Sequence, residues 1–379
     1  MKLPWGVEQV MFESKNRYPI AIDMSDNPIY AAQFRKSRKG PVVRGLAHKK
    51  RNGYDGDEPD DSETGLISIL KDLLKERRFS GKKAVLHLPH GSISSFPVRV
   101  LVEKAQMLEE AILRESKEYI SFPLNEAVID YPSLIPSSAD EKDHYRVTIT
   151  AIQRDVIHRY LQICKRAGLI VEAIDFDVSS LIRLHAFLCE ISENPVILCN
   201  MDRKKIMIAV LTCTGILAER HVSWGFSHLI DRIRSNLELP GPDYQTEGLL
   251  SQYGLAHDEY HDGNSEGIDG EITDDSIRLA IYQIITPYIE ELIDEFHKMT
   301  VYLRSEERDA SVEKIYLYGH ANSIHGLNCY LEKRLNIPTE LVNPATRLTI
   351  DEGAGLRDPS DGAPFGLALG LALRRVTWL

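Results

Sequence analysis

The 379-residue sequence lacks the features of three classes of protein. Its five cysteines form no Cys-x-x-Cys pair and no zinc-type cluster, so a disulfide framework and a structural metal site are not expected. No run of about 18 apolar residues occurs, which argues against direct membrane insertion. The formal net charge of −11 gives no basic footprint for nucleic acid. These absences predict a cytoplasmic protein whose thiols stay reduced.

What the sequence does have is enough apolar material for a sizeable core. Hydrophobic residues make up 43% of the chain, and its length suggests two or three domains at roughly 150 residues each. Strand-like and helix-like periodicities alternate along it, which is typical of an α/β protein. Two acidic segments, 48–64 and 257–275, carry no apolar periodicity and are expected to be solvated loops.

A strand, tight turn and strand pattern occurs twice. The first copy is PIAID and IYAAQF, joined by the turn at 24–28, and the second is PVILCNMDRKKIMIAVL from Pro195. Asn200 stands where Asp23 stood, an offset of 200 − 23 = 177 residues, close to half the chain. In two-lobed nucleotide-binding folds, such turns hold phosphates with their amides, and a carboxylate beside each turn holds Mg²⁺. The repeat therefore predicts two α/β halves, each beginning with a hairpin.

Other segments fill in the two lobes. Helices are expected at 65–77, 178–191, 225–237, 246–253, 327–335 and 364–374, and a strong amphipathic helix is expected to begin at Pro287, where proline suits the first helical position. Between 98 and about 170 the pattern changes to strand, helix, strand, strand, helix. This segment is expected to form a small α+β module inserted into the first lobe.

The run AILRESKEYISFPLNEAVIDY at 111–131 resembles the signature of PilM-type proteins of type IV pilus assembly. Similar pieces follow in the same order: VIHRYLQICKRAGLIVEAID at 156–175, residues 287–302, IYLYGHANSIHGL at 315–327 and FGLALGLALR at 365–374. Together they cover most of the chain outside the acidic loops.

The resemblance implies an α/β, two-lobed actin-like ATPase fold of the duplicated ribonuclease H-like kind, with an inserted small α+β subdomain. The subdomains it implies are 1A (1–97 and 170–193), 1C (98–169), 2A (194–237 and 306–379, with the C-terminal helix) and 2B (238–305). It also implies ATP and magnesium in a central cleft.

The partner implied by the resemblance is the N-terminal peptide of a PilN-like inner-membrane protein, held in a groove beside 1C. The residues expected to bind it are Tyr119, Ile120, Phe122, Pro123 and Leu124. The protein would then lie at the inner membrane only through this partner, and a homo-oligomer is left open.

The first phosphate turn departs from the family pattern. Where PilM-like proteins have Asp-Ile-Gly-Ser, this chain has Asp23, Met24, Ser25 and Asp26. Ser25 puts a Cβ where glycine allows close approach of the backbone to a phosphate, and Asp26 adds a charge that repels it. Only the acid at Asp23 is kept.

The other two nucleotide motifs depart as well. In the second turn, Asn200 replaces an aspartate and Asp202 a glycine, although Lys204 and its basic neighbours supply positive charge. At the adenosine side Gly319 is kept, but His320 replaces the second glycine. We expect no catalytic residue and no resident metal, and interpret the chain as a scaffold with a degenerate nucleotide cleft.

Several alternatives stay open at this point. Asp23 also fits a plain turn cap, and His320 fits a structural histidine. Asp175 and Asp177 fit a water-positioning acid, and Asp177 also fits a helix cap. The whole chain also fits an active ATP-binding member, or a small-molecule kinase of the same superfamily. An FtsA-like filament protein, or a relative from a type II secretion system, fits less well, because neither an amphipathic C-terminal helix nor a fused transmembrane segment is apparent.

Overall fold

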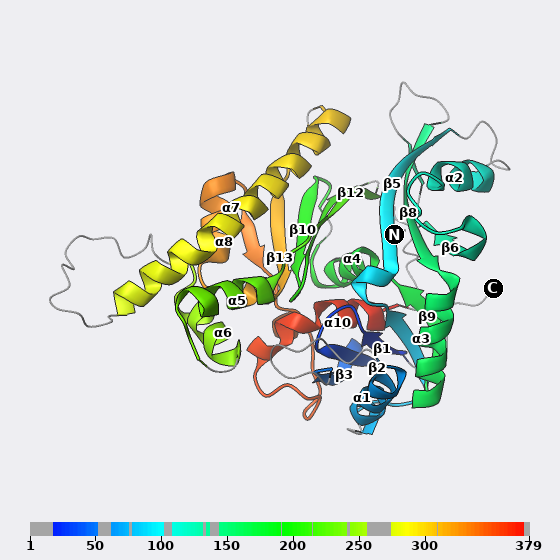
Figure 1. Cartoon of the computed structure of the whole chain (residues 1–379), viewed down its shortest axis with the longest axis horizontal. Coiled ribbons are helices and arrows are strands. Elements are labelled where there is room, and N and C mark those ends of the chain that lie inside the picture. Colours follow the sequence, from blue (N-terminus) through cyan, green and yellow to red (C-terminus); the bar gives the residue numbers. More distant parts are fainter. Residues whose placement is uncertain are drawn as a thin grey trace. The chain divides into compact units, whose positions relative to one another are not determined.

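The computed structural model describes residues 18–51, 62–75, 78–101, 108–131, 134–136, 144–190, 192–213, 215–240, 243–255, 274–308 and 310–374 (Figure 1). The chain divides into two compact units: unit 1 is Met1–Glu193, Leu211–Glu219 and Pro344–Leu379, and unit 2 is Asn194–Val210 and Arg220–Asn343. No helix in the described part of the chain is long and apolar enough to cross a bilayer.

Unit 1 is built on a five-stranded sheet in the order β3-β2-β1-β4-β9. The strands are β1 (Ile20–Asp23), β2 (Ile29–Ser37), β3 (Gly40–Lys49), β4 (Lys83–His87) and β9 (Ile170–Asp175). The expected hairpin is confirmed, since β1 and β2 pair antiparallel, while β4 and β9 continue the sheet in parallel. Strand β3, which pairs antiparallel with β2, was not predicted from the sequence.

Helices pack on this sheet. On one face, α1 (Glu63–Lys75) and α3 (Arg154–Ala167) share a core with Ile20 and Ile22, which alternate along β1 as strand geometry requires, and with Met24 just after it. Strands β1 and β2 also pack against α10 (Gly366–Ala372), which contacts α4 (Asp177–Leu188). A Cβ at Gly370 would come within 2.0 Å of the Ser180 carbonyl oxygen, so only glycine allows α10 to lie this close to α4. The short α9 (Pro344–Arg347) and η6 (Pro359–Phe365) precede α10.

The inserted module has its own sheet and core. Its strands follow the order β5-β8-β6, with β7 also paired to β8, and α2 packs on β5. The elements are η1 (His90–Ser92), β5 (Ile93–Leu101), α2 (Leu108–Ser116), η3 (Leu124–Glu126), β6 (Ala127–Asp130), β7 (Leu134–Pro136) and β8 (His144–Gln153). Buried residues of α3 join the core of the first sheet instead. The subdomain bounds expected from the sequence stay a prediction.

The second five-stranded sheet repeats the strand order of the first. It runs β12-β11-β10-β13-β14, in which β13 lies parallel to both β10 and β14. The strands are β10 (Val196–Met201), β11 (Ile206–Thr212), β12 (Gly215–Val222), β13 (Lys314–Gly319) and β14 (Thr339–Leu341). In the first sheet, β4 and β9 follow on from the first hairpin strand, β1. In the second sheet, β13 and β14 follow on from β10 in the same way. This shared order agrees with the duplicated fold expected from the sequence.

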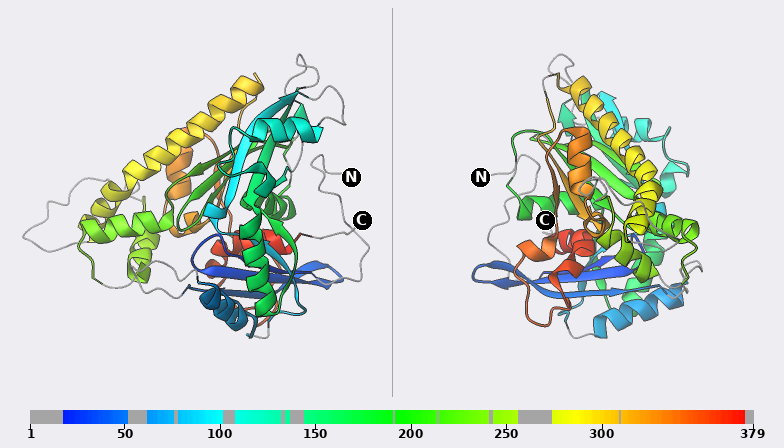
Figure 2. Two further views of the ribbon diagram at one scale, coloured as in Figure 1. Left: turned by 45° about the vertical axis from the view of Figure 1, so that its right-hand side comes forward. Right: turned by 90° about the vertical axis from the view of Figure 1, so that its left-hand side faces the viewer.

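The helices of unit 2 are α5 (Phe226–Asn236), α6 (Asp243–Gln252), α7 (Asp274–Glu306), η5 (His320–Ser323) and α8 (Leu327–Leu335). The expectation that a helix begins at Pro287 is wrong, because α7 runs through this proline and lies beside α8 (Figure 2). Ile281 and Ile285 are buried in the same helical phase as Ile289 and Phe296. Packing of this continuous apolar stripe outweighs the hydrogen bond that proline removes.

Candidate functional site

The turn after β1 holds the first candidate phosphate site. Asp23 is buried, and the parallel register of β1 and β4 places it opposite His87. Its Oδ1 lies 3.1 Å from His87 Nδ1 and accepts a hydrogen bond of 3.0 Å from the backbone N–H of Ser25. Burial alone would raise the pKa of Asp23, but His87 and the hydrogen bonds from Ser25 outweigh burial and lower it. The carboxylate is therefore held ionised by groups of the protein itself.

The rest of this turn is fastened by its neighbours. Ser25 and Asp26 are buried, and Asp26 Oδ1 accepts a 2.7 Å hydrogen bond from the N–H of Asn27. The buried guanidinium of Arg51 donates through Nη2 to the carbonyl of Met24, and the Arg51 N–H donates to Asn27 Oδ1 at 2.8 Å. The structure thus brings Asp23, Ser25 and Asp26 together and adds a buried cation beside their turn.

The turn between β10 and β11 holds the second candidate phosphate site. Asn200 is buried and its Nδ2 donates to Asp202 Oδ1 at 2.7 Å. The carbonyls of Asp202 and Arg203 accept hydrogen bonds from the N–H groups of Phe226 and Ser227 at 2.9 and 2.8 Å. Those amides open α5, where a helix N-terminus would otherwise suit an anion. They are instead engaged by the turn, and Lys204 is exposed.

The candidate adenosine side of unit 2 is filled by protein groups. Gly319 has φ +67°, and a Cβ there would lie 2.5 Å from the Met201 carbonyl oxygen, so glycine is required. The next residue, His320, is buried and stacks on Phe226 with ring centroids 4.8 Å apart. The guanidinium of Arg203 lies 6.0 Å from the Phe226 ring, and its Nη1 donates to Glu247 at 2.9 Å. These contacts bring His320 and the second turn together.

His320 gives this unit a pH dependence. Burial and, next, the charge of Arg203 lower the pKa of His320 to about 3. The unfolded chain then binds more protons between about pH 3 and the ordinary histidine value of about 6.5, so the histidine costs stability as the pH falls through that window.

The free energy of unfolding of the parent chain should fall when the pH is lowered from 7 to 5. A His320→Phe variant, which keeps a stacked ring, should lose about 2 kcal/mol less over the same pH change. Urea unfolding at both pH values measures this difference. The exposed His297→Phe on α7 is the matched control, and equal losses in the parent and the His320 variant would contradict the prediction.

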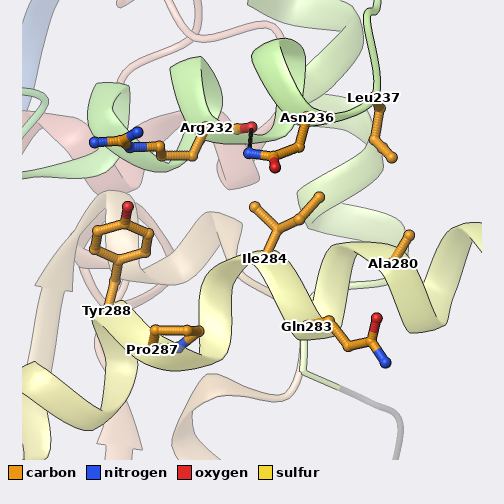
Figure 3. Close-up of a pocket in the computed structure, with 8 residues that line it drawn as sticks. All are labelled: Arg232, Asn236, Leu237, Ala280, Gln283, Ile284, Pro287 and Tyr288. Atoms are coloured by element: carbon orange, nitrogen blue, oxygen red, sulfur yellow. Dashed lines mark hydrogen bonds between the residues drawn. The ribbon is translucent and has the colours of Figure 1, made fainter.

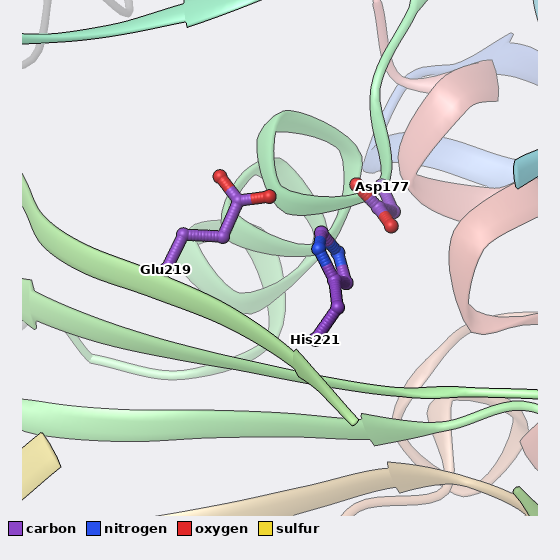
Figure 4. Close-up of side chains that lie close together, drawn as sticks. All are labelled: Asp177, Glu219 and His221. Carbon is purple, nitrogen blue, oxygen red and sulfur yellow. The ribbon is translucent and has the colours of Figure 1, made fainter. Parts of the chain in front are cut away.

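The two acids at the end of β9 are held differently from each other. Asp175 accepts hydrogen bonds from Arg183 Nη2 at 2.8 Å and belongs to an ion pair with Arg374 at 2.9 Å, so it serves as a clamp within unit 1. Asp177 is the first residue of α4 rather than its cap, and its Oδ1 accepts from the next N–H. A carboxylate oxygen of Glu219 lies within 4.8 Å of Asp177, and Figure 4 also labels His221 two residues further along β12.

The residues expected to bind a partner lie at the end of α2 and before β6. Tyr119 is 54% exposed and stacks on Phe96 with centroids 4.9 Å apart. Ile120 is buried in the core of the inserted module, Phe122 and Leu124 pack against that core, and Pro123 is exposed. Helix α2 ends at Ser116, three residues before Tyr119, and residues 102–107 lie outside the described residues. A binding role for these side chains stays a prediction.

Sequence reasoning missed Arg51, His87 and Phe226 as residues of these sites. His87 had a usable signal, because it lies at the end of a strand that runs parallel to β1, and the ends of parallel strands meet at one edge. Arg51 and Phe226 gave none, since their places depend on how β3 and α5 pack.

Comparison with known proteins gives a consistent picture. A family model described as "Type IV pilus assembly protein PilM" matches residues 21–376. A solved PilM–PilN type IV pilus biogenesis complex is similar over 94% of this chain and 98% of the other, with 21% identity and a TM-score of 0.73. The ethanolamine utilization protein EutJ from Carboxydothermus hydrogenoformans is similar over 95% of this chain and 90% of the other, with 14% identity and a TM-score of 0.52. MreB5 of Spiroplasma citri bound to ADP is similar over 94% of this chain and 95% of the other, with 12% identity and a TM-score of 0.51. The fold is that of the actin-like ATPases.

Proposed function

Because the chain belongs to the type IV pilus assembly protein PilM family, we propose that it is a scaffold of a pilus machine that binds the N-terminal peptide of a PilN-like inner-membrane protein. The family match over residues 21–376 is the observation that carries this proposal. The protein would be held at the inner membrane through that partner.

The inserted module is the part of the chain that we assign to the partner. It exposes apolar side chains that its own core does not use, among them Leu113 on α2, Tyr119 and Val128 on β6. Exposed aromatic and aliphatic groups on a rigid module are what a short peptide needs as anchor sites. Immobilised peptide from the N-terminus of a PilN-like protein should retain the full chain, while a scrambled peptide of equal composition should not. Equal retention on both peptides would contradict the proposal.

We further propose that the nucleotide cleft is degenerate. This rests on each half taken by itself: Asp23 is engaged by His87, while Asn200 and Asp202 bond to each other. At the adenosine side His320 fills space against Phe226. ATP would have to displace contacts that the protein already makes.

Calorimetric titration with ATP and Mg²⁺ is expected to show a dissociation constant weaker than about 1 mM. The double variant Ser25→Gly, Asp26→Ser restores the family pattern in the first turn and removes one like charge, so it should bind ATP about tenfold more tightly. Tight, Mg²⁺-dependent binding by the parent chain would contradict the degenerate cleft.

A further inference from the structure

Unit 2 carries an open groove of about 600 Å³ between α5 and α7. One wall is formed by residues 232 and 236 of α5 and by residue 237 just after it. The other is formed by residues 280, 283, 284, 287 and 288 of α7 (Figure 3). The groove lies where Pro287 interrupts the hydrogen bonding of α7. It belongs to unit 2 alone and shares no residue with the inserted module.

The groove combines an apolar surface with polar groups. Leu237, Ile284 and Pro287 supply the apolar part, and Ile284 points from α7 toward α5 (Figure 3). Pro287 has no N–H to donate to the carbonyl of Gln283, four residues earlier, so this part of the helix keeps an acceptor that an ordinary helix would satisfy. The Asn236 side chain uses Nδ2 to donate to the Arg232 carbonyl at 2.8 Å, which leaves its oxygen as an acceptor.

Arg232 is the charged group of the groove. Its guanidinium lies 5.9 Å from the Tyr288 ring centroid, and its Nε lies 3.4 Å from His228 Nε2. Across the described residues no carboxylate forms an ion pair with Arg232, whereas Arg234 on the same helix pairs with Asp243 at 2.8 Å. An exposed arginine that lies over a ring suits a carboxylate, because its planar fork loses little freedom on binding.

The wall that holds this arginine is rigid. Tyr288 contacts His228 with ring centroids 4.9 Å apart and Trp224 with centroids 5.9 Å apart, both edge to face. Trp224 is itself buried. Tyr288 is therefore packed against Trp224 and His228, and the Arg232 guanidinium lies over its ring.

We propose that the α5–α7 groove is a second docking site, for a short segment of a partner protein that presents a carboxylate next to an aliphatic side chain. The carboxylate would pair with Arg232, and the aliphatic side chain would pack on Ile284, Leu237 and Pro287. Charge complementarity selects this occupant, because the groove offers a cation that no described carboxylate pairs, beside an apolar surface. The open form of the groove suits a segment lying across it.

A random 12-residue peptide library displayed on phage and panned on the immobilised full chain tests this site. Enriched peptides are expected to share Asp or Glu next to Leu, Ile or Val, and to be lost when the panned protein is Arg232→Glu. Failure to enrich such a motif, or enrichment that the variant retains, overturns the proposal.

The affinity of the most enriched peptide gives the quantitative test. We expect Arg232→Glu to weaken binding about tenfold or more, and a peptide with lysine in place of its acid to recover binding to that variant. Arg304→Glu, the same charge change at an exposed site later in α7, should leave the affinity within about twofold. Trp224 fluorescence, in a chain whose other two tryptophans are phenylalanine, reports occupancy next to Tyr288.

Other occupants give distinct results. If a second copy of this chain fills the groove, sedimentation will show a dimer that Arg232→Glu dissociates, and the peptide proposal fails. Binding of the PilN-like peptide tests the inserted module and is measured in a separate experiment. Failure of that proposal therefore leaves the test of the α5–α7 groove unchanged. An Ile284→Asp variant that keeps its cooperative unfolding but binds the enriched peptide normally would also overturn the proposal.

Discussion

A Tyr119→Glu variant is expected to bind the PilN-like peptide at least about tenfold more weakly than the parent chain, a loss of about 1.4 kcal/mol. Tyr119 is 54% exposed, yet its ring is held by stacking on Phe96. A rigid, exposed tyrosine contributes a large contact area at little cost in conformational entropy, and a carboxylate in its place would be repelled from an apolar anchor.

The stability of this variant separates a lost anchor from a lost fold. Because the Tyr119 side chain is more than half exposed, the free energy of unfolding should change by less than about 1 kcal/mol. Lys117→Glu, an exposed change of charge in the same turn, is the matched control and should bind nearly as the parent does. If the Tyr119 variant and the parent bound the peptide with equal affinity, the assignment of the partner site to the inserted module would be contradicted.

The largest loss of stability is expected from Asp175→Ala. Asp175 is 1% exposed and its carboxylate meets two guanidinium groups, Arg183 from α4 and Arg374 after α10. Arg183 also donates through Nη1 to the Gly370 carbonyl at 2.8 Å. Removing the acid leaves two partly buried cations without their shared partner, so we expect a loss of about 3 kcal/mol in the free energy of unfolding.

Urea unfolding of the Asp175→Ala and Asp175→Asn variants measures this effect. Asparagine keeps an acceptor but not the charge, and its loss should be smaller. The result also decides between two roles for this residue. If Asp175 positioned a water for ATP hydrolysis, the alanine variant would keep its stability and lose ATPase activity, whereas the clamp predicts a loss of stability.

The sequence predicts the local parts of the fold well, for a physical reason. The hairpin of β1 and β2 is specified by alternating apolar residues and a turn rich in turn formers, so it can be recognised without knowing its neighbours. The run at 111–131 likewise lies in one stretch of chain, and the family match confirms the family that it resembles. Local patterns are sufficient where the structure is local.

The parts that the sequence did not predict depend on packing between distant segments. Helix α7 continues through Pro287 because Ile281 and Ile285 are buried in phase with later residues, which overrides the local rule for proline. The pairing of Asp23 with His87 depends on the register of β1 and β4, 64 positions apart. Arg51 reaches the first turn only because β3 pairs with β2.

The most direct test of the scaffold is a calorimetric titration of the PilN-like N-terminal peptide into the full chain, with and without ATP and Mg²⁺. A scaffold with a degenerate cleft predicts saturable binding without nucleotide, and an affinity that ATP changes by less than about twofold, because coupling between sites requires that both ligands bind. No binding in either condition would contradict the partner assignment. Binding that appears only with ATP and Mg²⁺ would contradict the degenerate cleft.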